Sequence, residues 1–258
     1  MAAMSAIDPP PPATRPFLWK HCLDVEQQAS DHYEEYVLTP VFDLEAFAPK
    51  RVIELGCAGG ALGAALKARH PAATVVGVDM GKRSVERAAG RVDRAIQADL
   101  DHFDFAQAGF DRGTVDTVIA IDVLEHLVNP WRLLERMKPW LAPAAQVLAC
   151  IPNMRNITIA AQLLLNGRFD YDERGLLDVT HLRFFTLHGI ERLFAETGYA
   201  IDDSRSVLLP SLEPLYYANK DKERVAIRIG RMTMTDVTAG EVLDLCAAQY
   251  IVRARPKE

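Results

Sequence analysis

The sequence has few cysteines, no long apolar run and no excess of basic residues. Its cysteines are too far apart in the chain for a metal-binding knuckle, so we expect free thiols in a reducing compartment; they are Cys22, Cys57, Cys150 and Cys246. No apolar run reaches the roughly 18 residues of a membrane span, and the prolines at positions 9–12 exclude the apolar core of a signal peptide. The net charge of −6 argues against a nucleic-acid partner, which needs a basic face. These absences predict a cytoplasmic protein.

The length and composition are those of one large globular domain. The chain has 258 residues, of which 49% are hydrophobic and 25% charged. Residues 1–16 are rich in proline and alanine, which predicts a disordered tail. Residues 17–40 predict an N-terminal helix that Pro40 ends. We therefore expect a single domain over residues 17–258, with that helix as its first element.

From residue 51 onward, short apolar stretches alternate with amphipathic segments. This alternation is typical of an α/β fold whose parallel sheet is covered by helices on both faces. Strands are predicted at 52–55, 74–78, 94–97, 115–121, 146–151, 200–208 and 249–254, and helices at 61–69, 82–89, 130–141, 157–165 and 187–197. Two insertions interrupt the pattern, at residues 153–185 and 211–243.

The most informative segment is the turn that follows the first predicted strand. The strand ends in Glu54, and small residues up to Gly63 lead into an alanine-rich helix. Glycines in such a turn let the backbone approach a bound nucleotide closely. Asp79 closes the next apolar stretch, where its carboxylate can accept hydrogen bonds from both ribose hydroxyls. Up to this point, a dinucleotide enzyme and an S-adenosylmethionine enzyme fit equally well.

Three further features favour S-adenosylmethionine. The acid at position 54 stands where a dinucleotide fingerprint has none, and Asp99 follows the third strand, where it can accept the adenine amino group. The fourth strand runs into Asp122-Val123-Leu124-Glu125-His126. With this segment, residues 30–210 resemble the class I S-adenosylmethionine-dependent methyltransferases, in particular the branch whose fourth strand ends in Asp-Val-Leu-Glu-His, which includes O-methyltransferases of ubiquinone biosynthesis. The segments 152–156, 166–169 and 178–186 resemble methyltransferases of polysaccharide gene sets.

The resemblance implies a Rossmann-like, seven-stranded, mostly parallel sheet with one antiparallel strand near its edge. It implies that S-adenosylmethionine is the cofactor, with S-adenosylhomocysteine as the product. The implied cofactor-binding residues are Glu54, Gly56, Cys57, Ala58, Gly60, Asp79, Met80, Asp99, Leu100, Ile121 and Asp122. Ala58 departs from the family pattern, where many members carry glycine. Its methyl group is tolerable if the backbone φ angle there is negative.

Two clusters compete to supply a general base. Asp122, Glu125 and His126 would share one helical face, so His126 is a candidate base and the trio an alternative divalent-cation site, although we expect no metal. The trio could equally cap and support the loop. The second cluster lies in the first insertion, which the resemblance makes a lid over the acceptor. There His181 would be the base and Arg183 an acceptor or cofactor-carboxylate contact, while packing alone would also explain them.

Two tyrosines of the predicted N-terminal helix, Tyr33 and Tyr36, either close the cofactor pocket or pack on the sheet.

These features favour O-methylation of a sugar or another small-molecule hydroxyl. Two alternatives stay open: N-methylation of a small amine, and a non-catalytic module that binds S-adenosylmethionine. A dehydrogenase is the weakest candidate. The Asn/Asp-Pro-Pro-aromatic motif of base methylation is absent, which with the acidic charge argues against nucleic acid as substrate. The sequence gives no indication of the oligomeric state or the acceptor.

Overall fold

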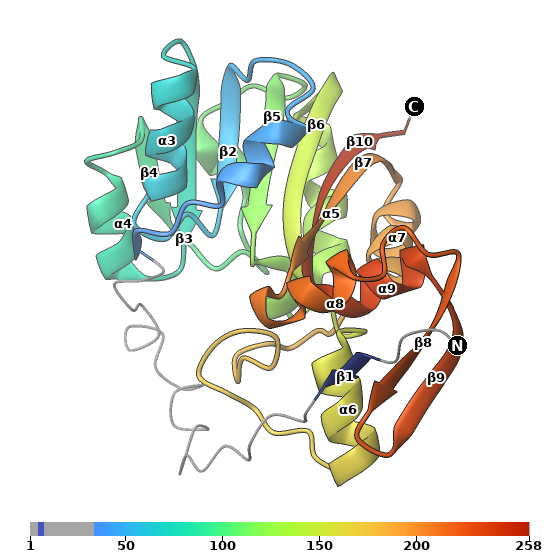
Figure 1. Ribbon diagram of the computed structural model, residues 1–258. Coiled ribbons are helices and arrows are strands. Elements are labelled where there is room, and N and C mark those ends of the chain that lie inside the picture. Colours follow the sequence, from blue (N-terminus) through green and yellow to red (C-terminus); the bar gives the residue numbers. More distant parts are fainter. Residues whose placement is uncertain (1–4, 8–33, 258) are drawn as a thin grey trace.

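The computed structural model describes residues 5–7 and 34–257, and a seven-stranded sheet forms its centre (Figure 1). Neighbouring strands follow the order β4-β3-β2-β5-β6-β10-β7. Strand β10 pairs antiparallel with both of its neighbours, β6 and β7. The other five strands, in the order β4-β3-β2-β5-β6, are parallel to one another. The strands span Arg51–Leu55 (β2), Thr74–Asp79 (β3), Arg94–Gln97 (β4), Val115–Ile121 (β5), Leu141–Pro152 (β6), Tyr199–Leu208 (β7) and Ala247–Pro256 (β10). The predicted Rossmann-like fold is confirmed.

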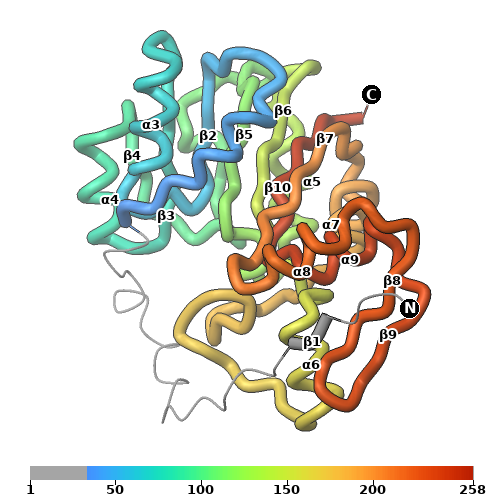
Figure 2. The backbone as a smooth tube through the Cα atoms, viewed as in Figure 1, coloured from blue at the N-terminus to red at the C-terminus, as the bar shows by residue number. Residues whose placement is uncertain are grey.

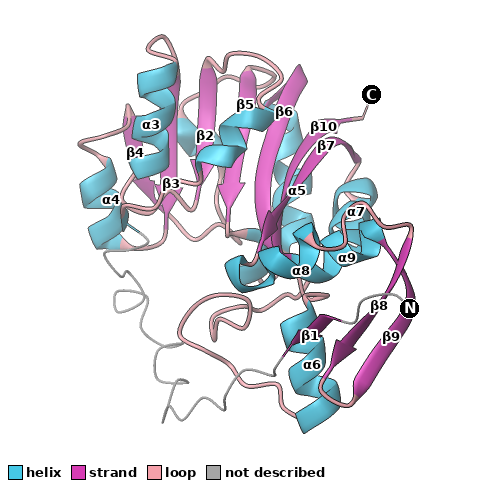
Figure 3. Ribbon diagram, in the orientation of Figure 1, coloured by secondary structure: helices cyan, strands magenta, loops and turns pink. Residues whose placement is uncertain are grey.

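Helices cover both faces of this sheet (Figure 3). Side chains of α5 (Pro130–Met137) and α7 (Leu187–Glu196) pack in one apolar core with the strands. Side chains of α3 (Ala61–Arg69), α4 (Lys82–Ala88) and the 3₁₀ helix η2 (Thr39–Leu44) belong to a second core. In β2, Val52 belongs to the second core and Ile53 to the first, because successive side chains of a strand point to opposite faces.

Local capping fixes where several helices begin. Asn129 precedes α5, and its side chain accepts a hydrogen bond from the amide of Arg132, while Pro130 takes the first helical position. Thr238 forms a capping box with Glu241 at the start of α9 (Ala239–Cys246). Gly167 ends α6 (Ile157–Asn166) in the left-handed conformation. These boundaries agree with the sequence prediction for α5 and α6.

The N-terminal region differs from the prediction. Residues 17–33 of the predicted helix lie outside the described residues. Pro40 begins a helical turn rather than ending one, since it occupies the first turn of η2, where proline's missing amide is not needed. Within the range predicted as a disordered tail, Ser5–Ile7 forms strand β1, which pairs parallel with β8 (Arg224–Ile229).

The two insertions form one small subdomain beside the carboxyl ends of the parallel strands (Figure 2). Helix α6 comes from the first insertion; η6 (Pro210–Leu212), α8 (Glu213–Tyr217), β8, β9 (Met232–Thr238) and α9 come from the second. Strands β1, β8 and β9 form a three-stranded sheet. Ile157 of α6 shares an apolar core with Ile227 of β8 and Leu245 of α9. Among the described residues, no helix combines the length and apolar character needed to cross a bilayer.

Candidate functional site

The turn between β2 and α3 is built on left-handed backbone angles. Gly56 and Gly60 have φ angles of +65° and +75°. A Cβ atom on Gly56 would lie 2.5 Å from a methyl group of Val123, so a side chain at this position would collide with the segment after β5. Ala58 has a φ of +42°, whereas we expected its methyl group to be tolerated at a negative φ. The alanine therefore stores backbone strain in the turn.

Asp79, at the carboxyl end of β3, fixes the position of this turn. One carboxylate oxygen accepts a hydrogen bond of 2.8 Å from the amide of Ala58, and the other accepts one of 2.8 Å from the amide of Gly81. Burial raises the pKa of the carboxyl, and these amide hydrogen bonds oppose that rise. Each oxygen keeps a second lone pair, so the carboxylate can still accept hydrogen bonds from a ligand.

Glu54 is buried in the strand end beneath the turn. Only 3% of the residue is exposed, and its Oε2 atom has no hydrogen-bond partner among the described residues. Burial, and to a smaller extent the nearby Asp79, raises the pKa of Glu54 to about 8. A Cβ atom on Gly63 would lie 2.5 Å from Oε2, so glycine at the first turn of α3 makes room for this carboxyl. Cys57, also buried, donates its amide to Val78 in β3.

Asp99 and Leu100 follow β4, beside the end of β3. The Asp99 carboxylate accepts hydrogen bonds from the amide of Asp101 at 2.9 Å and pairs with Nδ1 of His102 at 2.6 Å. Leu100 is buried, whereas Met80 is about half exposed. The residues from Glu54 to Leu100 that the sequence predicts to bind the cofactor thus lie at the carboxyl ends of β2, β3 and β4. This is the edge at which open α/β sheets bind ligands.

Strand β5 ends in Ile121, and Asp122 then adopts a left-handed conformation with a φ of +52°. This strained residue is held by Gln249 of β10, whose amide donates to Oδ1 at 2.6 Å. Burial raises the pKa of Asp122 to about 7. The pKa of Tyr36 rises to about 12, first through burial and then through the negative charge of Asp122, so this tyrosine lies near the end of β5.

The two segments that the sequence offered as competing base clusters meet in the structure. The carbonyl of Glu125, in the 3₁₀ helix η4 (Leu124–His126), accepts hydrogen bonds from the amides of both Leu182 and Arg183, at 2.8 and 2.9 Å. The lid segment is thereby joined to the end of β5 through main-chain atoms. The clusters form one site rather than two.

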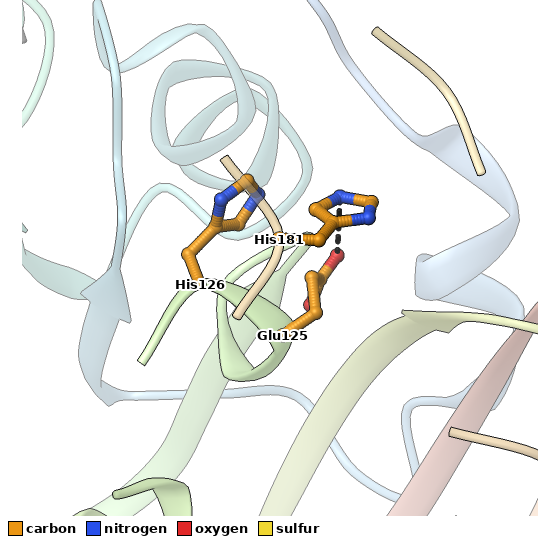
Figure 4. Close-up of side chains that lie close together, drawn as sticks. All are labelled: Glu125, His126 and His181. Carbon is orange, nitrogen blue, oxygen red and sulfur yellow. Dashed lines mark ion pairs between the residues drawn. The ribbon is translucent and has the colours of Figure 1, made fainter. Parts of the chain in front are cut away.

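Two imidazoles face each other at this junction. The rings of His126 and His181 contact edge to face, with centroids 4.8 Å apart (Figure 4). Thr180 donates its hydroxyl hydrogen to Asp178 at 2.6 Å, so its oxygen accepts the Nδ1 hydrogen of His126 at 3.0 Å. Nδ1 of His181 donates to the carbonyl of Leu176 at 3.3 Å. Both rings therefore keep an unprotonated Nε2.

Glu125 completes this group. The residue is 1% exposed, and neither carboxylate oxygen has a hydrogen-bond partner among the described residues. Oε1 lies 4.0 Å from Nε2 of His181. Burial raises the pKa of Glu125 well above its ordinary value; burial likewise lowers the pKa of His126, and that of His181 to about 4.

The guanidinium of Arg183 donates hydrogen bonds to the carbonyl of Val128, so the arginine holds the loop before α5. Its contact with the acceptor or the cofactor carboxylate stays a prediction. The alternative cation set differs from the one expected. Ligand atoms of Glu125 and His126 lie within 4.8 Å of His181, and Asp122 is not part of this group. Asp122 precedes η4 instead of starting a helical turn, so the expected shared face does not form.

Sequence reasoning missed the role of Thr180. The signal was present, because an Asp-x-Thr pattern directly before a histidine predicts a local side-chain turn in which Asp178 binds the amide and hydroxyl of Thr180. Asp101 was missed as well; it accepts the amides of Val128 and Asn129 and holds the start of α5.

Comparisons with known proteins agree with this architecture. A 29% identical relative, the trans-aconitate 2-methyltransferase of Deinococcus radiodurans, matches over 69% of this chain and 67% of its own length. A ubiquinone biosynthesis O-methyltransferase of Psychrobacter arcticus is 25% identical over 60% of this chain and 61% of its own length. A SAM-dependent methyltransferase structure from Thermotoga maritima has a TM-score of 0.57 at 14% identity, covering 93% of this chain and 99% of that one.

The chain spans between 58% and 67% of the length of the first three curated relatives it matches. Because the solved structure is only 14% identical to this chain, the similarity to it supports the fold alone. The methyltransferase domain family matches residues 28–204, which include β2 to β6 and the lid segment. The chain therefore belongs to the methyltransferase domain family, and its fold is that of the class I S-adenosylmethionine-dependent methyltransferases.

Proposed function

We propose that this chain transfers the methyl group of S-adenosylmethionine to a hydroxyl group of a sugar or another small molecule. The supporting observation is the junction of η4 with the lid, which places two imidazoles with free Nε2 atoms beyond the end of β5. When bound, the sulfonium cofactor supplies an electrophilic methyl group. A hydroxyl acceptor must lose its proton as its oxygen attacks that carbon, so a nearby proton acceptor is needed.

The donor would bind along the carboxyl ends of β2, β3 and β4. Asp79 would hold the ribose with its remaining lone pairs, while Asp99 and Leu100 frame the adenine. The turn from Gly56 to Gly60 would wrap around the methionine part of the cofactor, and Ile121 and Asp122 would line the path to the acceptor. This assignment fits the chain because Asp79 and Asp99 stand at the ends of neighbouring strands.

His126 and His181 would take the acceptor's proton. Each ring is fixed through Nδ1, which leaves Nε2 oriented without the cost of ordering it during the reaction. We expect His181→Ala to keep S-adenosylhomocysteine affinity within about threefold and to lower turnover by roughly 100-fold or more. Near-normal turnover in this variant would remove His181 from the mechanism. His188→Ala, an exposed position in α7, is the matched control.

Calorimetry tests the donor assignment directly. Purified protein is titrated with S-adenosylhomocysteine and, separately, with NAD; we expect binding of the first alone. Tight binding of NAD alone would refute the proposal.

The acceptor class is tested by incubating the protein with labelled S-adenosylmethionine and panels of sugars, phenols and amines. Methylation confined to amines would favour the N-methyltransferase alternative, and donor binding without any transfer would favour the non-catalytic one.

A further inference from the structure

A buried carboxylate without partners points to a missing positive charge at the junction of η4 and the lid. Both oxygens of Glu125 lack hydrogen bonds among the described residues, although the residue is 1% exposed. Burying a carboxylate in this state costs several kcal/mol unless it is protonated or paired. No lysine or arginine is paired with this carboxylate among the described residues, and its nearest ion-pair partner is His181, at 4.0 Å.

The neighbouring side chains are those that bind transition metals. Ligand atoms of Glu125, His126 and His181 all lie within 4.8 Å of one another, and the three side chains converge in Figure 4. Two imidazoles and one carboxylate are a donor set suited to zinc and its neighbours in the first transition row, whereas magnesium and calcium prefer oxygen donors throughout.

The outer contacts of both rings match those of metal-bound histidines. Such histidines usually donate the second ring N–H to a carbonyl or to a carboxylate system, which fixes the ring and the nitrogen that binds the ion. His126 donates to Thr180, which is itself bonded to Asp178, and His181 donates to the carbonyl of Leu176. Each Nε2 is therefore left as the metal-binding nitrogen.

We propose that Glu125, His126 and His181 form a site for one divalent transition-metal ion, represented by Zn²⁺. Donor atoms around a zinc ion lie about 3.3 Å apart, as bond lengths of about 2.0–2.1 Å require. Oε1 of Glu125 and Nε2 of His181 are 4.0 Å apart, so these two groups must draw together by roughly 0.7 Å when the ion binds. His181 belongs to the lid and Glu125 to η4, which follows β5. A bound ion would therefore hold the lid against the carboxyl end of β5.

Three protein ligands leave an open coordination position, as in catalytic metal sites. The inference rests here on the proposed function: a hydroxyl bound at that position would lose its proton to water more readily, and its oxygen would then attack the methyl carbon while the carbon–sulfur bond breaks. With the ion bound, the Nε2 atoms of His126 and His181 are metal ligands and cannot accept the proton; direct proton transfer to an imidazole therefore applies only to the metal-free protein.

The test uses the full chain, free of any histidine tag, and needs no acceptor. Zinc chloride is titrated into the protein by calorimetry at fixed pH, and cobalt(II) is added for visible absorption spectra. We expect one zinc ion per chain, with a dissociation constant of about 1 μM or lower, and cobalt bands of a site with mixed nitrogen and oxygen ligands. Failure to bind zinc below about 100 μM would overturn the proposal.

Variants identify the ligands. His181→Ala, His126→Ala and Glu125→Gln should each weaken zinc binding by roughly 100-fold or more, a larger loss than for an outer-contact residue. His188→Ala and Asp122→Asn should stay within about threefold of wild type. If Asp122→Asn loses zinc while His181→Ala keeps it, the ion sits on another set of residues and the proposal is wrong. The cobalt spectrum of the unmodified protein decides the question if a variant does not fold.

Measurement of S-adenosylhomocysteine binding in the same samples separates the two proposals. Binding of the nucleoside without zinc would leave the donor assignment standing and refute the metal site. Binding of zinc without the nucleoside would do the reverse.

Discussion

At the scale of single residues, the turn between β2 and α3 contains an alanine at a position whose backbone geometry favours glycine. Ala58 adopts a φ of +42°, while its amide bonds to Asp79. An L-residue with a side chain pays about 1–2 kcal/mol for this conformation. The strain is sustained because Gly56, Gly60 and Asp79 fix the chain on both sides of it.

We expect Ala58→Gly to relieve this strain and raise the free energy of unfolding by up to about 1 kcal/mol, since the greater freedom of glycine in the unfolded chain offsets part of the gain. Urea denaturation measures it. Ala64→Gly, inside helix α3, serves as the control and should lower stability by about 1 kcal/mol. A loss of stability in Ala58→Gly equal to that of the control would contradict the interpretation that Ala58 is strained.

Glu54 gives the protein a pH dependence with a defined sign. Its pKa in the folded state is about 8, above the ordinary value of 4.5, so the folded chain holds a proton that the unfolded chain has released. The stability tied to this group is therefore complete below pH 4.5 and is lost as pH rises toward 8.

Glu54→Gln stays neutral, so we expect its urea midpoint to fall less than that of wild type between pH 5.5 and 8.5. The exposed Glu86→Gln should follow the wild-type curve. Parallel curves for Glu54→Gln and wild type would show that Glu54 is ionised in the folded protein at neutral pH.

At the scale of elements, the lid and the second insertion are held by one shared core. Ile227 of β8 is fully buried in this core and pairs with β9 and β1. Truncation of a buried isoleucine to alanine costs about 2–5 kcal/mol. The small sheet does not belong to the seven-stranded sheet, so the damage should stay local.

We expect Ile227→Ala to increase hydrogen exchange in α6, β8 and β9, while β2 and β5 keep their protection and S-adenosylhomocysteine still binds. Ile119→Ala, in the central strand β5, provides the contrast and should reduce protection across the large sheet. A uniform loss of protection in Ile227→Ala would mean that the two sheets unfold as one unit.

The sequence predicted the elements of the large sheet well, and the site less completely. Periodicity and capping residues such as Asn129 act locally, so they can be read from neighbouring positions. The contact between Glu125 and His181 joins positions more than fifty residues apart, and the left-handed angle of Asp122 depends on Gln249. Residues 211–243 could not be assigned because their core is shared with α6 and their small sheet includes β1, both distant in the sequence.

At the scale of the whole molecule, donor binding should stabilise the fold by mass action. At a ligand concentration of about 100 times the dissociation constant, S-adenosylhomocysteine should add about 2.7 kcal/mol. For a chain of this size the melting temperature would then rise by roughly 5–10 °C. We expect Asp79→Asn to lose most of this rise and the exposed Asp111→Asn to keep it.

Differential scanning calorimetry of each variant, with and without ligand, measures this shift. The comparison is made within each variant, because Asp79 also bonds to Ala58 and Gly81 and its replacement changes the melting temperature of the ligand-free protein. An unchanged rise in Asp79→Asn would exclude Asp79 from the donor site.

The bonds from Leu182 and Arg183 to the carbonyl of Glu125 involve main-chain atoms only. Every amino acid except proline can form them as donor, and any amino acid can accept them. The exposed side chain of Leu182 can therefore change during evolution without loss of its main-chain bond to Glu125, and the lid stays attached. New acceptor preferences could arise here by point substitution, each tried on a scaffold whose geometry does not depend on the outcome.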